Sequence, residues 1–244
     1  MTLPRILIGG LAVVVILVAA AVGGWWFFVR EDAKLATNAP AIPADLKQTP
    51  PASAKTPGGT ATGDGLTFTI IPDRSEAAYF ADEKLASLPL PSTAKGSTKD
   101  IAGAFHLTAD GFDLDASQPT TFTVNLKTLT SDKSQRDKRV QNQGLETGTY
   151  PTATFTATKV TGFDKSMPAD QEQALQLSGT LDLHGVKKDV TWDVKAKRDG
   201  NIITALATVN FQFADFGIPV LNIAGFVSVQ DAVTLQVQVV AQAS

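Results

Sequence analysis

The chain has 244 residues, with 21 Lys or Arg and 24 Asp or Glu, which gives a net charge of -3 at pH 7. Such a balanced charge argues against a nucleic-acid-binding protein, which usually has a strongly basic surface. There is no cysteine, and the only histidines are His106 and His184. The composition therefore excludes disulfides and a cysteine nucleophile, and it leaves little from which to build a zinc site or a histidine-dependent triad.

The first 30 residues contain a long apolar run. Residues 6–29 carry no charge, and about 20 such residues span a bilayer core. Trp25 to Phe28 stand at the far end of the run, where aromatic rings prefer the membrane interface. We predict that residues 1–30 are a membrane anchor. The alternative is a signal peptide cleaved near Ala19 to Ala21.

With the N-terminus on the inner side of the membrane, both interpretations place the rest of the chain outside the cytoplasm. A retained anchor predicts a single-pass protein of a bacterial inner membrane, with its domain on the periplasmic or extracellular side. A cleaved signal peptide predicts a secreted or periplasmic protein.

Residues 31–65 have the composition of a linker. They contain five prolines, many Ala and Thr residues and no aromatic residue. Such a segment buries too little apolar surface to offset the entropy of ordering. We therefore expect a disordered, fairly extended stalk that holds the following domain away from the membrane.

Residues 66–244 predict one all-β domain. Alternation of apolar and polar residues with a period of two, which is typical of half-buried strands, recurs along this part of the chain, and turn signals separate the runs. Eight or nine long, sequentially connected strands favour an up-and-down antiparallel barrel over an immunoglobulin-like sandwich. The runs are 66–70, 77–85, 101–108, 121–126, 152–162, 175–183, 190–196, 203–213 and 233–239.

One charged segment, residues 131–142, interrupts the β pattern. Thr130 or Ser131 is a suitable N-cap, and charges of opposite sign stand four residues apart, as in Asp132 and Arg136. We predict a short helix that crosses one end of the barrel.

Three motifs in this order resemble the YceI-like, polyisoprenoid-binding family. They are Arg136-Asp137, the Tyr-Pro-x-x-x-Phe run at 150–155, and the Gly-x-Leu-x-Leu-His-Gly run at 179–185. The resemblance covers most of 66–244 and implies a lipocalin-like barrel of eight strands with a long apolar lumen that binds polyisoprenoids or other long lipids. Two segments depart from the family pattern, at 72–79, where many members have a His-Ser pair, and at 85–99, which is longer and richer in Pro and Ser.

The inward-facing residues of such a barrel are candidates for a ligand-binding lumen. A barrel of about eight strands either fills its interior with side chains or holds one ligand, and each buried methylene of a lipid would contribute roughly 0.8 kcal/mol. The alternative is a filled barrel that serves as an interaction or structural module of the envelope. The candidate lumen residues are Phe122, Val124, Phe155, Leu181, Trp192, Val194, Ala205, Phe211, Phe213 and Leu235.

Arg136 and Arg139 in the predicted helix have two interpretations. They contact an anionic headgroup at the barrel mouth, or they belong to a solvated helix face with internal ion pairs. Arg136 and Asp137 are also interpreted as a structural pair that ties the helix to the barrel.

No motif indicates an enzyme. The sequence has no Gly-x-Ser-x-Gly, no phosphate-binding glycine loop and no His-Glu-x-x-His. His184, in a Leu-His-Gly turn, is interpreted as structural. We therefore expect no catalytic residues, no metal and no cofactor, and as partners a long-chain lipid and the membrane.

Overall fold

The computed structural model describes residues 33–47, 65–85, 91–111, 113–164, 168, 170–223 and 227–243. Within these ranges no helix is long and apolar enough to cross a membrane. The predicted anchor, residues 1–30, lies outside the described residues.

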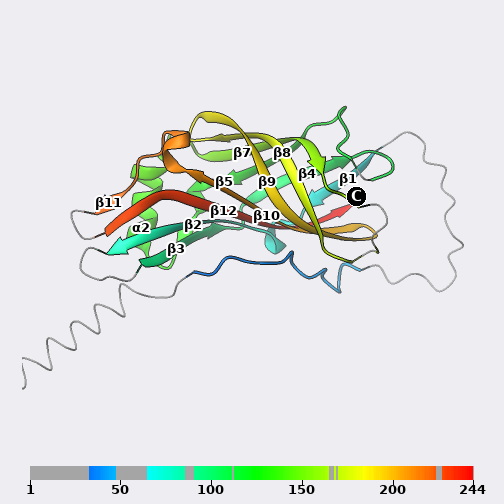
Figure 1. Cartoon of the computed structure of the whole chain (residues 1–244), viewed down its shortest axis with the longest axis horizontal. Helices are drawn as coiled ribbons and strands as arrows, with labels where there is room; N and C mark the ends of the chain where they lie inside the picture. Colours follow the sequence, from blue (N-terminus) through cyan, green and yellow to red (C-terminus); the bar gives the residue numbers. More distant parts are fainter. Residues whose placement is uncertain are drawn as a thin grey trace, which may run out of the picture.

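The described domain is a closed antiparallel barrel (Figure 1). Its strands follow one another around the barrel in the order β1-β4-β5-β7-β8-β9-β10-β12, and β12 pairs again with β1. This ring of eight strands confirms the predicted architecture. The strands are β1 (Leu66–Ile70), β2 (Glu76–Leu85), β3 (Pro91–Thr98), β4 (Ile101–Leu107), β5 (Thr120–Asn125), β6 (Thr130–Ser131), β7 (Thr152–Thr161), β8 (Gln173–Leu183), β9 (Val186–Asp199), β10 (Ile202–Gln212), β11 (Asn222–Ile223) and β12 (Val227–Ala243).

At two places in the barrel wall, two strands lie end to end and together occupy the place of one strand. Strands β1 and β2 both pair with β12, and a single 3-10 turn at Pro72–Arg74 separates them. Ser75 secures this joint, since its buried hydroxyl donates to the Ile71 carbonyl (2.8 Å) and accepts from the Val240 amide (3.0 Å). Strands β3 and β4 continue beside β2 and β1 in the same way. The 72–79 segment, which departs from the family pattern, is thus a bend in one wall strand.

The predicted runs fall on all the other long strands, but β3 was missed, as were the two-residue strands β6 and β11. Its sequence, Pro-Ser-Thr-Ala-Lys-Gly-Ser-Thr, contains no large apolar residue. The residues that face inward are nevertheless buried, among them Ala94 and Thr98. Small residues suffice here because the Tyr79 ring of β2 lies over Gly96, where a Cβ atom would approach the ring to 2.3 Å.

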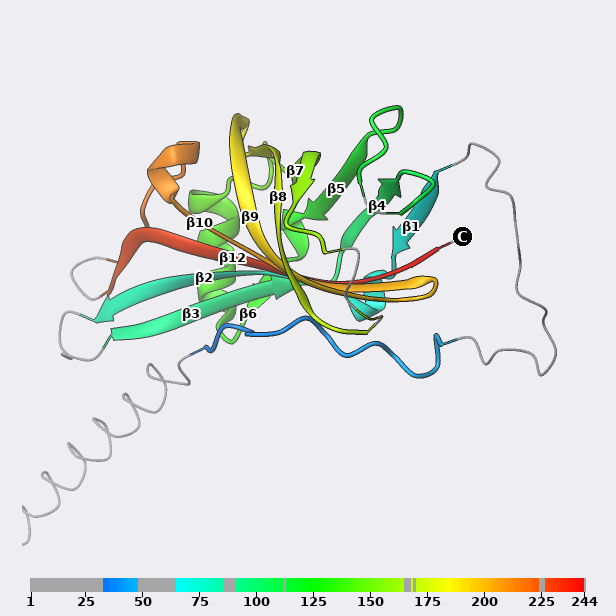
Figure 2. The same cartoon turned by 45° about the vertical axis from the view of Figure 1, so that its right-hand side comes forward.

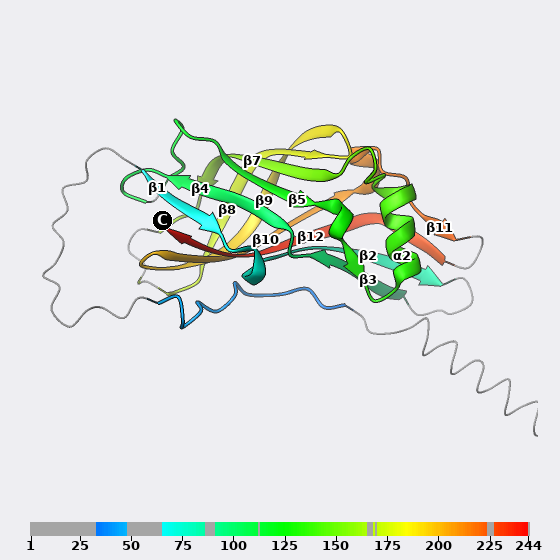
Figure 3. The same ribbon diagram turned by 180° about the vertical axis from the view of Figure 1, so that it is seen from behind.

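The predicted short helix is confirmed at one end of the barrel. Helix α2 (Ser134–Arg139) continues into a wide turn at Val140–Gly144, and together they lie across the end where β2, β3 and β12 begin or finish (Figure 3). Strand β6, which precedes the helix, pairs with β3. The helix is therefore held at the rim of the barrel rather than in its wall.

The prediction of a disordered linker is wrong for residues 33–47. This segment, which we call the strap, lies along the outside of the barrel (Figure 2). The Gln236 side chain binds the Ala36 backbone twice, accepting from its amide (2.9 Å) and donating to its carbonyl (3.0 Å). Further along, Ile42 packs on Ile202 and Val240, all three buried. Backbone hydrogen bonds and one apolar anchor order the strap despite its composition.

The strap covers the outward face of β10. Ile202, Thr204 and Leu206 alternate with the inward-facing residues of this strand, yet their exposed fractions are 0%, 0% and 3%. An uncovered barrel would expose these side chains to solvent. The folded domain therefore includes residues 33–47, and it begins earlier in the chain than the predicted boundary at residue 66.

We expect Ile42→Ala to lower the free energy of unfolding by about 2 kcal/mol, because it removes buried apolar contacts between strap and barrel. Leu35→Ala in the same strap is the matched control, since Leu35 is 45% exposed and its loss should cost little. Urea denaturation of residues 33–244 measures both. Equal stabilities of the two variants would contradict a stabilising role for the strap.

Candidate functional site

The barrel encloses a cavity of about 870 Å³, at the upper end of the range for small-molecule sites. Its wall is almost entirely apolar. All ten candidate lumen residues line it, and they come from six strands and the turn after β10: Phe122 and Val124 on β5, Phe155 on β7, Leu181 on β8, Trp192 and Val194 on β9, Ala205 and Phe211 on β10, Phe213 just after β10, and Leu235 on β12. These ten residues therefore face the cavity, and their contact with a ligand stays a prediction.

Small inward-facing residues leave the room for this cavity. Ala77, Ala153, Ala205 and Ala207 all line it, on strands β2, β7 and β10. Gly179 has a different role, since its missing Cβ atom admits the Phe155 ring and the neighbouring strand, which it would meet at 2.8 Å and 2.2 Å. The empty volume follows from the alanines, while the glycine allows two strands to approach closely.

One side of the cavity is a chain of aromatic rings. The centroids of Phe105 and Phe122 lie 4.7 Å apart, those of Phe122 and Phe155 6.4 Å apart, and those of Phe155 and Trp192 5.8 Å apart. The Phe155 and Trp192 rings meet edge to face, which is a favourable arrangement of aromatic quadrupoles. Sequence analysis missed Phe105 as a lining residue, although it precedes His106 in a predicted strand.

The cavity has one polar end, at helix α2. The solvent-exposed residues among its lining are Asp132, Ser134, Gln135 and Pro219. The first three lie in α2 or just before it and Pro219 lies just before β11, and α2 and β11 are at the same end of the barrel (Figure 1). We call it the mouth. The opposite end of the barrel is packed with buried apolar side chains that do not line the cavity, such as Phe68. The cavity therefore opens beside α2 and extends along the barrel axis.

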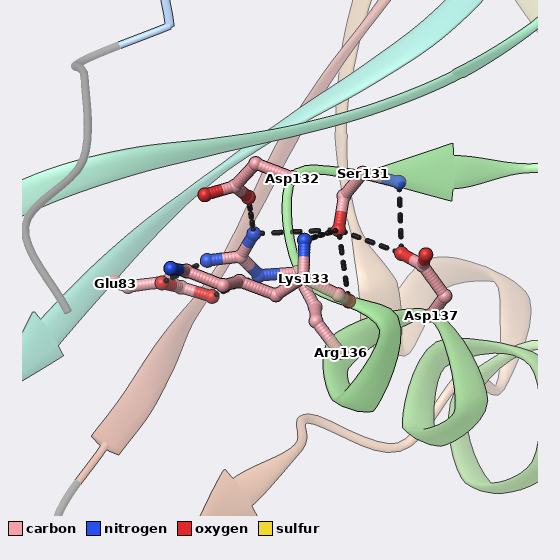
Figure 4. Close-up of polar contacts among 6 residues, drawn as sticks. All are labelled: Glu83, Ser131, Asp132, Lys133, Arg136 and Asp137. Carbon is pink, nitrogen blue, oxygen red and sulfur yellow. Dashed lines mark hydrogen bonds and ion pairs between the residues drawn. The ribbon is translucent and has the colours of Figure 1, made fainter. Parts of the chain in front are cut away.

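An ion pair between helix and barrel lies at the mouth (Figure 4). The Arg136 guanidinium donates to both carboxylate oxygens of Glu83 on β2, with Nε and Nη2 each at 3.1 Å. It also pairs with Asp132, as the spacing of four residues predicted. Both Arg136 and Glu83 line the cavity. Arg136 thus ties the helix to the barrel.

The pairing of Arg136 with Asp137 is wrong. Asp137 instead accepts hydrogen bonds from the amide (2.8 Å) and the hydroxyl (2.6 Å) of Ser131. It therefore closes the turn that leads from β6 into α2. The two neighbouring residues both fix the helix, but through different partners on different sides of it.

Two carboxylates stabilise the charged form of Arg136. Burial disfavours the guanidinium cation, but Glu83 and Asp132 outweigh it and leave the pKa of Arg136 raised. A permanently charged guanidinium with two carboxylate partners is already neutralised. Arg139, one turn along at α2, also lines the cavity and has no carboxylate partner among the described residues. Among the described residues of the lining, Arg139 is thus a cation at the mouth whose charge no carboxylate neutralises.

Tyr79 lies on the cavity wall beside this ion pair. Burial raises the pKa of its phenol above the ordinary value, and the nearby carboxylates of Asp137 and Glu83 act in the same direction. The unfolded chain releases this proton near pH 10, whereas the folded domain retains it. The contribution of the protonated Tyr79 phenol to the free energy of unfolding is therefore fully present below about pH 10, and it is lost as the pH rises further.

We expect Tyr79 to resist ionisation at pH values where an exposed tyrosine ionises. The chain has only two tyrosines, so the Tyr150→Phe variant isolates Tyr79. Its phenolate absorbance near 295 nm should appear only well above pH 10, together with unfolding. Ionisation near pH 10 in the folded protein would contradict a buried phenol.

His184 is held by structural contacts, as interpreted. It occupies the left-handed region with φ of 55°, in a turn that Gly185 completes with φ of 74°. Its ring lies 3.1 Å from the Glu146 carboxylate and 3.3 Å from the Phe216 carbonyl, and it packs against Tyr150. These contacts connect the β8–β9 turn to the loops at the mouth end.

Comparison with known proteins agrees with this architecture. Residues 68–241 match the family model of the YceI-like domain. The chain belongs to the YceI-like family. A UPF0312 protein of Vibrio vulnificus is 31% identical over 183 residues, which cover 70% of this chain and 93% of that relative. A UPF0312 protein of Pseudomonas putida is 31% identical over 186 residues, which cover 71% of this chain and 88% of that relative.

Two solved structures share the fold of this YceI-like domain. A polyisoprenoid-binding domain from Saccharophagus degradans, implicated in plant cell wall breakdown, has a TM-score of 0.57 at 16% identity and covers 73% of this chain and 99% of its own. BcnA from Burkholderia cenocepacia has a TM-score of 0.51 at 16% identity and covers 71% of this chain and 99% of its own.

Proposed function

We propose that this YceI-like domain binds the chain of a long isoprenoid, or of a similar amphiphilic lipid, inside its barrel. The observation that carries the proposal is the apolar cavity of about 870 Å³ with a single polar mouth. An amphiphile is likewise divided into an apolar tail and a polar head. Its tail would lie among the aromatic rings and alanines, and its head would lie at α2. The polyisoprenoid-binding domain of S. degradans, which has the same fold, supports this class of ligand.

The role we propose is carriage or storage of the lipid without chemistry, outside the cytoplasm, with residues 1–30 as a membrane anchor. Support for binding over catalysis comes from the cavity wall, whose polar groups lie at the mouth rather than converging on one point inside it. The alternative of a filled barrel that serves only as an interaction module is disfavoured, because alanines replace the side chains that would fill the interior.

The head of the ligand is expected to meet Arg139 rather than Arg136. We expect Arg139→Gln to weaken binding of a prenyl phosphate by about tenfold, since a hydrogen bond to a charged group contributes roughly 1.5 kcal/mol. Binding of the matching prenyl alcohol should change little. Titration calorimetry with both ligands measures the difference. Equal losses for phosphate and alcohol would show that Arg139 does not contact the head.

Native mass spectrometry of residues 33–244, purified gently from a bacterial host, tests the proposed function. A stoichiometric added mass that an organic extract identifies as a long-chain lipid is the expected result. The contrary result is an empty protein that also takes up no added prenyl alcohol or prenyl phosphate. The strap is kept in this protein because it covers the outside of the barrel.

A further inference from the structure

The strap begins at the mouth end of the barrel. The Ala33 amide donates to the Thr93 carbonyl on β3 (3.3 Å). Thr93 stands opposite Asp82 in the β2–β3 ladder, one residue from Glu83 of the mouth ion pair. The first described residue of the chain is therefore fixed beside the opening of the cavity.

From there the strap runs the length of the barrel toward the opposite end (Figure 2). Gln236 holds it at Ala36, and the Lys195 ammonium donates to the Thr37 carbonyl (2.6 Å). At its far end Lys47 pairs with Asp199 (2.9 Å), where β9 finishes. Contacts at the start, middle and end thus fix its direction as well as its position.

Very little chain separates the strap from the apolar run. Val29 closes the run and Ala33 opens the strap, four residues later, and four residues span at most about 14 Å. The barrel is much longer than this tether, because the eleven residues of β10 alone extend about 37 Å at the rise of an antiparallel strand. If the apolar run is in a bilayer, only the mouth end lies within reach of that bilayer.

We propose that the strap holds the cavity mouth against the surface of the membrane that anchors the chain. This proposal rests on the proposed function, specifically on residues 1–30 as an anchor. The occupant of the mouth face is the lipid bilayer itself. Arg139 lines the cavity and the neighbouring Lys138 is exposed; both belong to α2 at this end, and cationic side chains favour anionic headgroups.

The proposed orientation would let a lipid move directly from the bilayer into the cavity. A lipid tail that leaves the bilayer beside α2 would enter the apolar cavity directly, without crossing a layer of water. Exposure of each methylene of a tail to water is unfavourable, so a short path lowers the barrier to transfer. The strap replaces the long stalk that composition alone predicted, and it holds the domain on the membrane instead of away from it.

Fluorescence quenching by a lipid headgroup tests the orientation. The full chain lacks cysteine, so Lys138→Cys on α2 and Ala109→Cys at the opposite end each give one site for a bimane label; both residues are exposed. The labelled proteins are reconstituted in phosphatidylcholine–phosphatidylglycerol vesicles that contain a lipid with a nitroxide headgroup. We expect quenching to be several-fold stronger at 138 than at 109. Equal quenching, or stronger quenching at 109, would overturn the proposal.

Insertions on the two sides of the strap supply a matched control. Twenty Gly/Ser residues between Asp32 and Ala33 give a flexible reach of about 25 Å, and quenching at 138 should fall to the level at 109. The same insertion between Lys55 and Thr56 follows the strap and should leave quenching unchanged. Equal effects of the two insertions would show that the strap does not set the orientation.

Flotation separates the possible failures. A chain that does not float with the vesicles overturns the anchor and the orientation together, while lipid binding by residues 33–244 in detergent still tests the cavity. A chain that floats and binds lipid but shows equal quenching overturns the orientation alone. A chain that floats with mouth-side quenching but binds no lipid overturns the carrier function instead.

Discussion

Replacing Ala205 with Trp is expected to shorten the lipid that the barrel accepts. Ala205 lies on β10 near the closed end of the cavity, opposite Val239, whereas Phe213 marks the mouth end of the same wall. An indole at position 205 would therefore fill the deep part of the lumen and leave the mouth open. The loss of about five buried methylenes would cost roughly 4 kcal/mol, or about a thousandfold in affinity.

The measurement is a series of prenyl alcohols of increasing length, titrated against both proteins. The affinity of the unmodified protein should rise with the length of the prenyl alcohol until the cavity is full. The affinity of Ala205→Trp should stop rising at a shorter alcohol. Ala102→Trp makes the same change on the exposed outer face of β4 and should follow the parent. An unaltered length profile in Ala205→Trp would place the ligand outside the lumen.

The inner wall was predictable because it depends on a local rule. Side chains alternate between the two faces of a strand, so one apolar series in each strand identifies the lumen whatever the exact pairing. This is why all ten candidate residues line the cavity. The rule fails for β3, where the inward positions carry Ala94 and Gly96. Their smallness follows from the size of Tyr79 on the neighbouring strand, and no property of β3 alone reveals it.

The strap was missed for a related reason. Its composition lacks the large apolar residues that usually offset ordering entropy, and the group that fixes it lies 200 residues away, in the amide of Gln236. A buried glutamine on the outer face of a strand carries no distinctive sequence signal. Partners that are distant in the chain also hid the bond between Arg136 and Glu83, although the local pair with Asp132 was predictable from its spacing.

Glu83→Gln is expected to destabilise the domain by roughly 3 kcal/mol. The side chains of Arg136 and Glu83 are only 20% and 15% exposed, and removal of one partner leaves a largely buried charge without full compensation. Glu76→Gln is the matched control on the same strand, because its pair with Lys95 is 29% and 35% exposed and exposed pairs contribute at most about 1 kcal/mol. Urea denaturation measures both variants.

The double variant Glu83→Met with Arg136→Met separates the value of the pair from the cost of breaking it. Since both charges are removed together, we expect it to recover most of the stability lost in Glu83→Gln, as apolar replacement of buried ion pairs often does. The polar edge of the mouth, however, would then be apolar on the side of β2. If the Arg136–Glu83 pair keeps the polar head of a bound lipid at α2, the double variant should discriminate less between a prenyl alcohol and the same prenyl chain without its hydroxyl group. Its stability should be near normal. Full loss of stability in the double variant would instead show that the hydrogen-bonded geometry of this pair is needed to hold the helix across the mouth.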